Sequence, residues 1–329
     1  MEKDILNILN TISSLPLKSV REIFQSNEFN KELTKQIEQK FDFANQMMIK
    51  VVAYKFQKGL ILAREGKLDL SAQAFDEGRK MKSLLSTEFE KRVVEITEFT
   101  AVSYWYYKNN DFDNAKKLLW MIIRVDEELE QNGFSILLGH RIQQLHNLAR
   151  INFRMGDFEE GCFIINTVLL YMSKIRVIPF EGRWRIEDLD EGMPVKNRGL
   201  MFWQLTSETI SFIYLYHPTQ FQEYFNLIFQ NISGSYPSSL DEEMVKDWVN
   251  LKEMYYEKNY VSFLEKILPF AQKIDINYTI YLYSLLVDIE QLYLFQTGNT
   301  IDSNIMQKIH LNLKLPAKFQ FVSSCLIEA

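Results

Sequence analysis

The four histidines are the first candidates for metal chemistry in this sequence, at positions His140, His146, His217 and His310. A di-iron helical bundle places a glutamate three residues before a ligating histidine, and none of the four has one. His140 and His146 are six residues apart, which puts them on different faces of a helix, whereas a zinc-binding helix uses i, i+4 spacing. We therefore expect no metal site.

Acidic runs and cysteines are the remaining candidates for catalysis. The all-helical terpene-synthase-like enzymes bind magnesium diphosphate through an aspartate-rich helix, and the nearest runs here are 111–113 and 187–191. The first fits a turn, where Asp and Asn are favoured, and the second reads as a solvated acidic run. Cys162 follows Gly161 on an apolar face, as a core residue would. With no Gly-x-Ser-x-Gly, phosphate loop or dinucleotide motif, we expect no catalytic residue, no cofactor and no enzyme activity.

Composition indicates which elements must position these side chains. The 329 residues include only 12 Gly and 7 Pro, too few for the frequent turns of an all-β fold, so we expect an all-α protein. The formal net charge of −6 disfavours nucleic acid as a partner. No apolar run reaches the ~18–20 residues of a membrane span, and Cys162 and Cys325 form no Cys-x-x-Cys pair. We expect a cytoplasmic protein with no membrane contact.

Three short breaks recur at nearly equal spacing. They are Glu65-Gly66-Lys67, Asn109-Asn110-Asp111 and Met155-Gly156-Asp157, and their central residues are 110 − 66 = 44 and 156 − 110 = 46 apart. A bulky residue and then a small one follow each break. A period of this length is typical of stacked helical repeats.

The residues around these breaks resemble the tetratricopeptide repeat, in which pairs of antiparallel helices stack into a superhelix. The family has small or bulky residues at fixed positions of each repeat. In the first repeat these positions hold Gly59, Ser71 and Phe75, in the second Phe99, Ser103, Tyr106, Ala115 and Leu119, and in the third Leu145, Ala149, Gly161 and Ile165. The resemblance implies an α-solenoid. The period exceeds the ~34 residues of the family, as in the long-helix repeat domains of bacterial peptide-responsive regulators. An irregular helical bundle is the alternative.

The pattern divides the chain into four parts. Residues 1–46 are expected to cap the stack, because a terminal repeat must cover an apolar face. Helix pairs then fill 47–175. Residues 176–199 hold several Gly and Pro and predict a long loop or a small hairpin. Further helical pairs occupy 200–329, with a possible sub-boundary at 231–240.

A tetratricopeptide-like stack binds its partner in a concave groove lined by the first helix of each pair. Projecting that register onto this chain selects Tyr104, Tyr107, Lys108, Gln143, His146, Asn147, Arg150 and Arg154. The last five follow one helical stripe at i, i+3, i+4, i+7 and i+11. Asn and Arg there could bond the backbone or a carboxylate of an extended peptide, and the tyrosines would add apolar area. A solvated helix face explains the same stripe.

These observations favour a non-enzymatic protein that binds a protein or peptide and acts as an adaptor or regulator. The alternative is an all-α enzyme or small-ligand carrier, because the region 200–296 is rich in Phe, Tyr and Trp that could line a cavity. Self-assembly through an exposed helix face is a third possibility. The sequence leaves open the identity of the partner, the pathway, the role of 176–199 and the oligomeric state.

Overall fold

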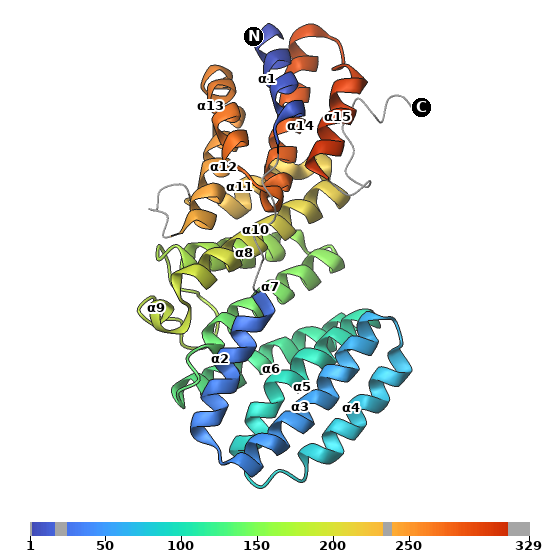
Figure 1. Cartoon of the computed structure of the whole chain (residues 1–329), viewed down its shortest axis with the longest axis vertical. Helices are drawn as coiled ribbons and strands as arrows, with labels where there is room; N and C mark the ends of the chain where they lie inside the picture. The colour runs from blue at the N-terminus through green and yellow to red at the C-terminus, as the bar shows by residue number, and fades with distance from the viewer. Residues whose placement is uncertain (1, 17–24, 233–238, 315–329) are drawn as a thin grey trace. The chain divides into compact units, whose positions relative to one another are not determined.

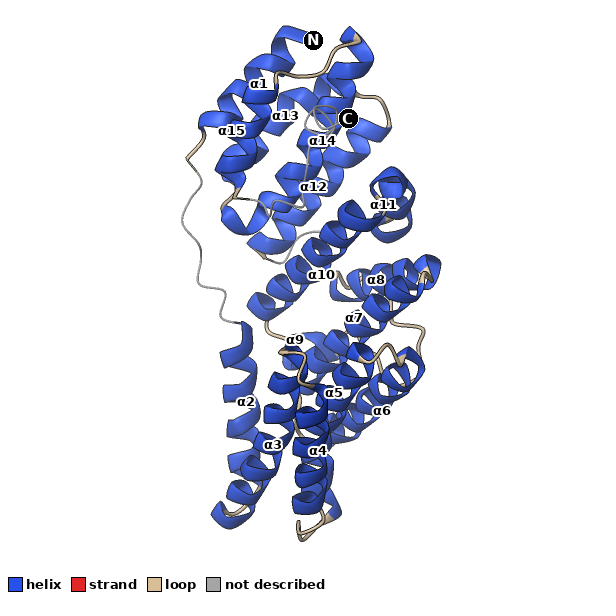
Figure 2. Cartoon of the chain, turned by 90° about the vertical axis from the view of Figure 1, so that its right-hand side faces the viewer, coloured by secondary structure: helices blue, strands red, loops and turns tan. Residues whose placement is uncertain are grey.

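A computed structural model describes residues 2–16, 25–232 and 239–314, which form helices joined by short loops and contain no β-strand (Figures 1 and 2). The all-α prediction is confirmed for these residues. The helices are α1 (Glu2–Ser14), α2 (Gln25–Lys40), α3 (Phe43–Arg64), α4 (Leu68–Lys82), α5 (Glu88–Lys108), α6 (Phe112–Gln131), α7 (Leu137–Met155), α8 (Phe158–Met172), α9 (Asp188–Gly192), α10 (Val195–Tyr216), α11 (Phe221–Phe229), α12 (Leu240–Tyr256), α13 (Tyr260–Lys273), α14 (Thr279–Thr297) and α15 (Ser303–Leu313). Single turns of 3₁₀-helix precede α11 and α14.

The chain forms two compact units. Residues 24–198 make up one, which we call the continuous unit, and residues 1–23 together with 199–329 make up the other, the split unit. In the continuous unit each helix packs on its neighbour in sequence from α3 to α8, and α3 also packs on α5.

The three breaks of the sequence pattern are turns of one conformation. Gly66, Asn110 and Gly156 have φ of 78°, 58° and 85°, in the left-handed region. The next residue donates its backbone N–H to the carbonyl five residues earlier in each case, at 2.9–3.0 Å, and becomes the N-cap of the second helix. This hydrogen bond is that of a Schellman helix end, so each pair is joined by the same tight connection.

A fourth copy of this turn joins α12 to α13 in the split unit. Lys258 has φ of 63°, and the N–H of Asn259 donates to the carbonyl of Met254 at 2.9 Å. The Asn259 side chain then caps α13 by accepting from the N–H of Ser262. The turn at 257–260 therefore has the geometry of the first three.

Small residues let the helices of a pair approach closely in the continuous unit. A Cβ added at Gly59 would overlap the ring of Phe75, and one added at Gly161 would overlap the ring of Phe153. The hydroxyl of Ser71 donates to the carbonyl of Gly59 at 2.8 Å and joins the backbones of α3 and α4. Each fully buried Phe stabilises the fold by about 2–3 kcal/mol, and these rings occupy the space that the glycines leave.

The helix α1 is part of the split unit, where it packs on α13, α14 and α15. Its apolar residues Ile5, Leu9 and Ile12 are buried, and the Asn312 side chain of α15 donates to the carbonyls of Ile12 and Leu15 at 3.2 and 2.8 Å. Residues 1–46, predicted to cap the stack, contain α2, which contacts α3, and α1, which packs on α13–α15. The helix α1 packs there because α13–α15 bury its apolar stripe.

A buried ion pair lies among aromatic rings in the split unit. Lys252 Nζ is 2.6 and 2.8 Å from the carboxylate oxygens of Asp288, and the lysine is fully buried. The rings of Phe221 and Tyr256 lie 4.7 and 4.9 Å from Nζ. Burial lowers the pKa of Lys252 and raises the pKa of Asp288 to about 6, because both charged forms lose hydration.

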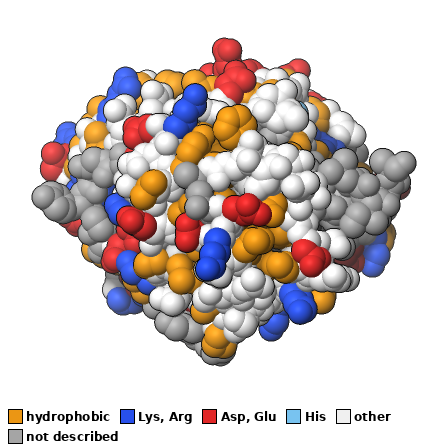
Figure 3. Space-filling model, turned by 90° about the horizontal axis from the view of Figure 1, so that it is seen from above, with side chains coloured by type: hydrophobic (Ala, Val, Ile, Leu, Met, Phe, Trp, Pro, Cys, Tyr) orange, Lys and Arg blue, Asp and Glu red, His pale blue; other side chains and the backbone are white. Residues whose placement is uncertain are grey.

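The segment 176–199 contains an irregular stretch followed by α9, and α10 begins at Val195. No strand occurs in it, so the segment is a loop and a short helix rather than a hairpin. Residues 233–238, inside the expected sub-boundary at 231–240, lie outside the described residues. On the face that Figure 3 displays, hydrophobic, acidic and basic side chains are interspersed.

Candidate functional site

The predicted residues of α5 form a cluster of rings and cations at the end of that helix. Two cations lie over the half-buried ring of Tyr104, Arg64 of α3 at 5.8 Å and Lys108 at 5.9 Å from its centre. Tyr107 lies 6.0 Å from Tyr104 and 5.9 Å from Phe112 of α6. Cations near the face of a tyrosine ring are attracted by its quadrupole. The cluster therefore presents positive charge and partly exposed aromatic area together.

The predicted residues of α7 differ in exposure. Arg150 and Arg154 are exposed, Gln143 and Asn147 are half-buried, and His146 is buried, with 1% of its surface exposed. The last turns of this stripe therefore face the solvent, while His146 points into the interior of the unit. The Nδ1 atom of His146 lies 3.3 Å from the amide nitrogen of Gln143.

A chain of hydrogen bonds runs from the interior to Asn147. The buried carboxylate of Asp126 lies 2.7 Å from Nδ1 of His140, and the amide nitrogen of Gln144 lies 2.9 Å from Nε2 of the same ring. The Asn147 amide then donates to Oε1 of Gln144 at 3.1 Å. Burial raises the pKa of Asp126, while His140 opposes that rise. The network fixes the orientation of the Asn147 side chain beside two exposed arginines.

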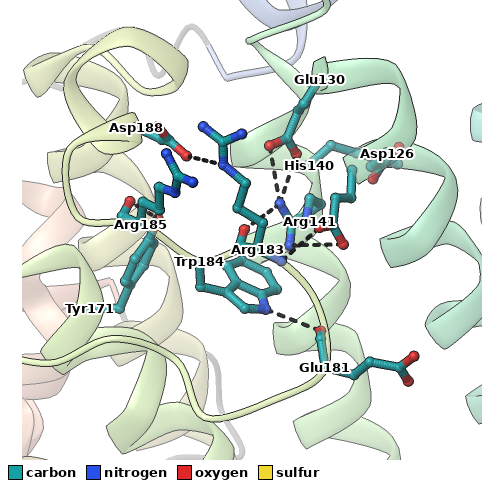
Figure 4. A network of polar contacts seen from close by, with 11 residues as sticks. Asp126, Glu130, His140, Arg141, Tyr171, Glu181, Arg183, Trp184, Arg185 and Asp188 are labelled. Atoms are coloured by element: carbon teal, nitrogen blue, oxygen red, sulfur yellow. Dashed lines mark hydrogen bonds and ion pairs between the residues drawn. The ribbon is translucent and has the colours of Figure 1, made fainter. Parts of the chain in front are cut away.

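Sequence reasoning missed Arg141, which is the centre of the network in Figure 4. It is fully buried, and its Nη1 donates to Glu130 at 3.0 Å and to the carbonyl of Arg183 at 3.0 Å. Its guanidinium lies 3.8 Å from the centre of the Trp184 ring, a cation–π contact. Burial raises the pKa of Glu130 to about 8, although Arg141 opposes that rise. The sequence does contain one sign that Arg141 is buried. It lies three residues after Leu138 and four before Leu145, and so on the apolar face of α7.

The loop after α8 is held against α6 and α7 by this network. Gly182 has φ of 110°, and a Cβ there would meet a carboxylate oxygen of Glu127. The same carboxylate accepts from the N–H of Arg183 at 2.7 Å, and the hydroxyl of Tyr171 donates to the carbonyl of Arg185 at 2.8 Å (Figure 4). Loop and helices therefore share one polar cluster.

The acidic run 187–191 is partly paired rather than only solvated. Asp188 forms an ion pair with Arg183 at 3.3 Å, and Asp190 pairs with Lys174 at 2.6 Å and with Arg198 at 2.9 Å. These partners lower the pKa of Asp190 through hydrogen bonds from Lys174 and then Arg198. In the part of the chain that the structure describes, no group of three His, Cys, Asp or Glu side chains is arranged to hold a metal ion. Cys162 is buried, and Cys325 lies outside the described residues.

The aromatic residues of the split unit pack ring against ring. Trp248 lies 5.5, 5.0 and 5.3 Å from Phe225, Phe229 and Tyr281, in edge-to-face arrangements. Tyr214 stacks on Phe221 at 4.1 Å. These contacts account for the abundance of rings in this region as core packing.

The comparisons with known proteins find no counterpart: neither a family model, nor a curated protein, nor a solved structure matches the chain. None of the described helices has both the length and the apolar character of a membrane span.

Proposed function

We propose that this chain is a non-enzymatic, tetratricopeptide-like α-solenoid that binds a protein or peptide in the cytoplasm and acts as an adaptor or regulator. The recurring turns at Gly66, Asn110 and Gly156 and the close helix pairs that they join support the repeat. The observation that carries the binding role is the hydrogen-bond chain from Asp126 to Asn147, since it holds an amide in place beside Arg150 and Arg154.

The chemistry of this surface suits an extended peptide. The Asn147 amide offers a donor and an acceptor to a peptide backbone, and an arginine binds a carboxylate through two parallel hydrogen bonds. Tyr104 and Tyr107 supply apolar area with few rotatable bonds. A side chain that is already oriented loses less entropy on binding, so the network behind Asn147 strengthens the interaction without touching the partner.

The test is affinity purification with mass spectrometry, followed by measured affinities for a captured partner. We expect Asn147→Ala/Arg150→Ala to weaken binding at least about tenfold, which corresponds to about 1.4 kcal/mol. The matched control is Asn226→Ala/Lys266→Ala, which removes an exposed amide and an exposed cation from the split unit. Unchanged affinity of the first variant would contradict the proposed site.

A second variant tests the buried support. Gln144→Leu interrupts the network between His140 and Asn147 and leaves the exposed arginines in place. We expect weaker binding through faster dissociation, since Asn147 is then free to rotate. The ring-against-ring packing around Trp248 supports a packed core there rather than the cavity that an enzyme or small-ligand carrier would need.

A further inference from the structure

The helix α3 carries a second apolar face that the fold leaves exposed. Phe43, Met47, Val51, Tyr54 and Ile61 expose between 39% and 76% of their surface. They are spaced by four, four, three and seven residues, so they form one stripe along the helix. The opposite face, with Ile49, Val52, Phe56 and Leu60, is buried in the core. A helix at the surface of a monomer normally has a polar outer face.

The stripe is large enough for an interface. A fully exposed Phe or Tyr offers about 150–250 Å², and Phe43 and Tyr54 are 76% and 65% exposed. With the three aliphatic side chains, the stripe presents about 500 Å² of apolar surface, in the range that marks interaction sites on soluble proteins. Two such stripes facing each other bury about 1,000 Å², which is the lower limit for a specific interface.

We propose that a second copy of this chain covers the stripe, with the two α3 helices antiparallel across a two-fold axis. The midpoint of the stripe is residue 52, since (43 + 61)/2 = 52. An axis there places Phe43 opposite Ile61 of the second copy, and Val51 opposite Ala53, next to Tyr54. Four of the five apolar residues thus lie opposite, or within one position of, an apolar stripe residue of the second copy, whereas Met47 lies opposite Gln57, beside Lys58.

The helix dipoles favour the same arrangement, since they attract when an N-terminus meets a C-terminus. Lys50 and Lys55, which flank the stripe, already pair with Glu38 and Glu77 at 3.0 and 2.8 Å. Their charges are therefore compensated within one copy, and Lys58, which also lies along the stripe, faces Gln46 and Met47 of the second copy rather than another cation.

Sedimentation equilibrium of the whole chain tests the proposal. We expect a reversible dimer with a dissociation constant in the micromolar range, as befits a small interface. Val51→Lys/Tyr54→Lys should raise that constant at least about 100-fold, because it places four unpaired charges in the interface. Both residues are exposed, so the unfolding midpoint of the monomer, measured well below the dissociation constant, should not change. The control Leu84→Lys/Val261→Lys alters exposed apolar residues elsewhere and should leave the dimer intact.

A monomer at every concentration would overturn the proposal, and so would a dimer that survives Val51→Lys/Tyr54→Lys. The orientation has its own test, since antiparallel pairing places position 47 beside Lys58 of the second copy. Met47→Glu should then change the dissociation constant only a few-fold, while Met47→Lys should raise it at least about tenfold. Equal weakening by the two variants would contradict the antiparallel arrangement. The result is independent of partner binding at Asn147.

Discussion

The pairs α3–α4 and α12–α13 share a turn and differ in what fills the space between their helices. The left-handed residues of the two turns are Gly66 and Lys258. Seven residues before them lie Gly59 in the first pair and Leu251 in the second, and five residues after them lie Ser71 and Phe263. All four of these residues are buried. The conformation of the turn therefore does not set how closely two helices pack. The small residues do, and the split unit instead places bulky side chains and a buried ion pair between its helices.

The largest effect is expected from the ion pair of the split unit. Lys252→Met leaves the carboxyl of Asp288 buried without its cation, which should cost about 3–5 kcal/mol of unfolding free energy. Urea unfolding measures it. Lys252→Met/Asp288→Leu removes both charges and should recover most of the loss, because a buried ion pair is seldom better than apolar residues of similar volume. If the single variant were as stable as the double, the pairing of these two groups would contribute nothing.

The next effect concerns the close pairs of the continuous unit. Gly59→Leu introduces the residue that α12 has at this position, and its side chain would overlap the buried Phe75 ring. We expect a loss of about 3 kcal/mol from overpacking, measured by thermal unfolding. Gly59→Ala should lose less, since the better helix propensity of alanine offsets part of the overlap. A Gly59→Leu variant as stable as the wild type would show that α3 and α4 separate at little cost.

The pH dependence of stability distinguishes the two units. A carboxyl with a raised pKa holds its proton more tightly in the folded state than in the unfolded state. Its contribution to the free energy of unfolding therefore falls as the pH rises from its unfolded pKa to its folded pKa. For Glu130 that interval ends at about 8, and for Asp288 at about 6. Between pH 6 and 8 the wild type should therefore lose about 2 kcal/mol relative to Glu130→Gln.

Urea unfolding at a series of pH values gives this comparison. The slope of the unfolding free energy against pH should differ between Asp288→Asn and the wild type only below about pH 6, where that carboxyl titrates. Identical slopes for wild type and Glu130→Gln from pH 6 to 8 would show that Glu130 does not titrate in this range.

The smallest effect is expected at the turns. Lys258 adopts the left-handed conformation at φ of 63°, which a residue with a Cβ rarely adopts. Lys258→Gly should stabilise the protein by about 0.5–1 kcal/mol, and Asn110→Gly by less, since Asn tolerates this region. Lys266→Gly, inside α13, should instead cost about 1 kcal/mol. Differential scanning calorimetry resolves these shifts, and a destabilised Lys258→Gly would contradict the account of the turn.

Sequence patterns predicted the parts of this fold that depend on neighbouring residues. Gly66, Asn110 and Gly156 mark turns because a left-handed residue and a following N-cap have local preferences that the sequence displays. The small residues at Gly59 and Gly161 were identified from the resemblance to the tetratricopeptide repeat. Helix period also placed Arg150 and Arg154 on an exposed face, as observed.

The parts that depend on distant residues were not predicted. His146 shares a stripe with Arg150, yet it is buried, because burial depends on which helices cover α7. Arg141 contacts Trp184 and the carbonyl of Arg183, more than forty residues away in a loop without a regular pattern. The docking of α1 on α13–α15 joins the two ends of the described chain, and a single amphipathic helix does not reveal which partner it has.

The position of α1 sets the order in which the two units can be completed during synthesis. The continuous unit, residues 24–198, lies within one uninterrupted stretch, so every helix of it exists before most of the split unit has been made. The split unit must retain its first helix until α13, α14 and α15 have been translated, and the bond from Asn312 to Ile12 spans 300 residues. Contacts of such separation form late. Until then α1 lacks the helices that bury its apolar stripe, and we expect the nascent chain to be prone to aggregation during that interval.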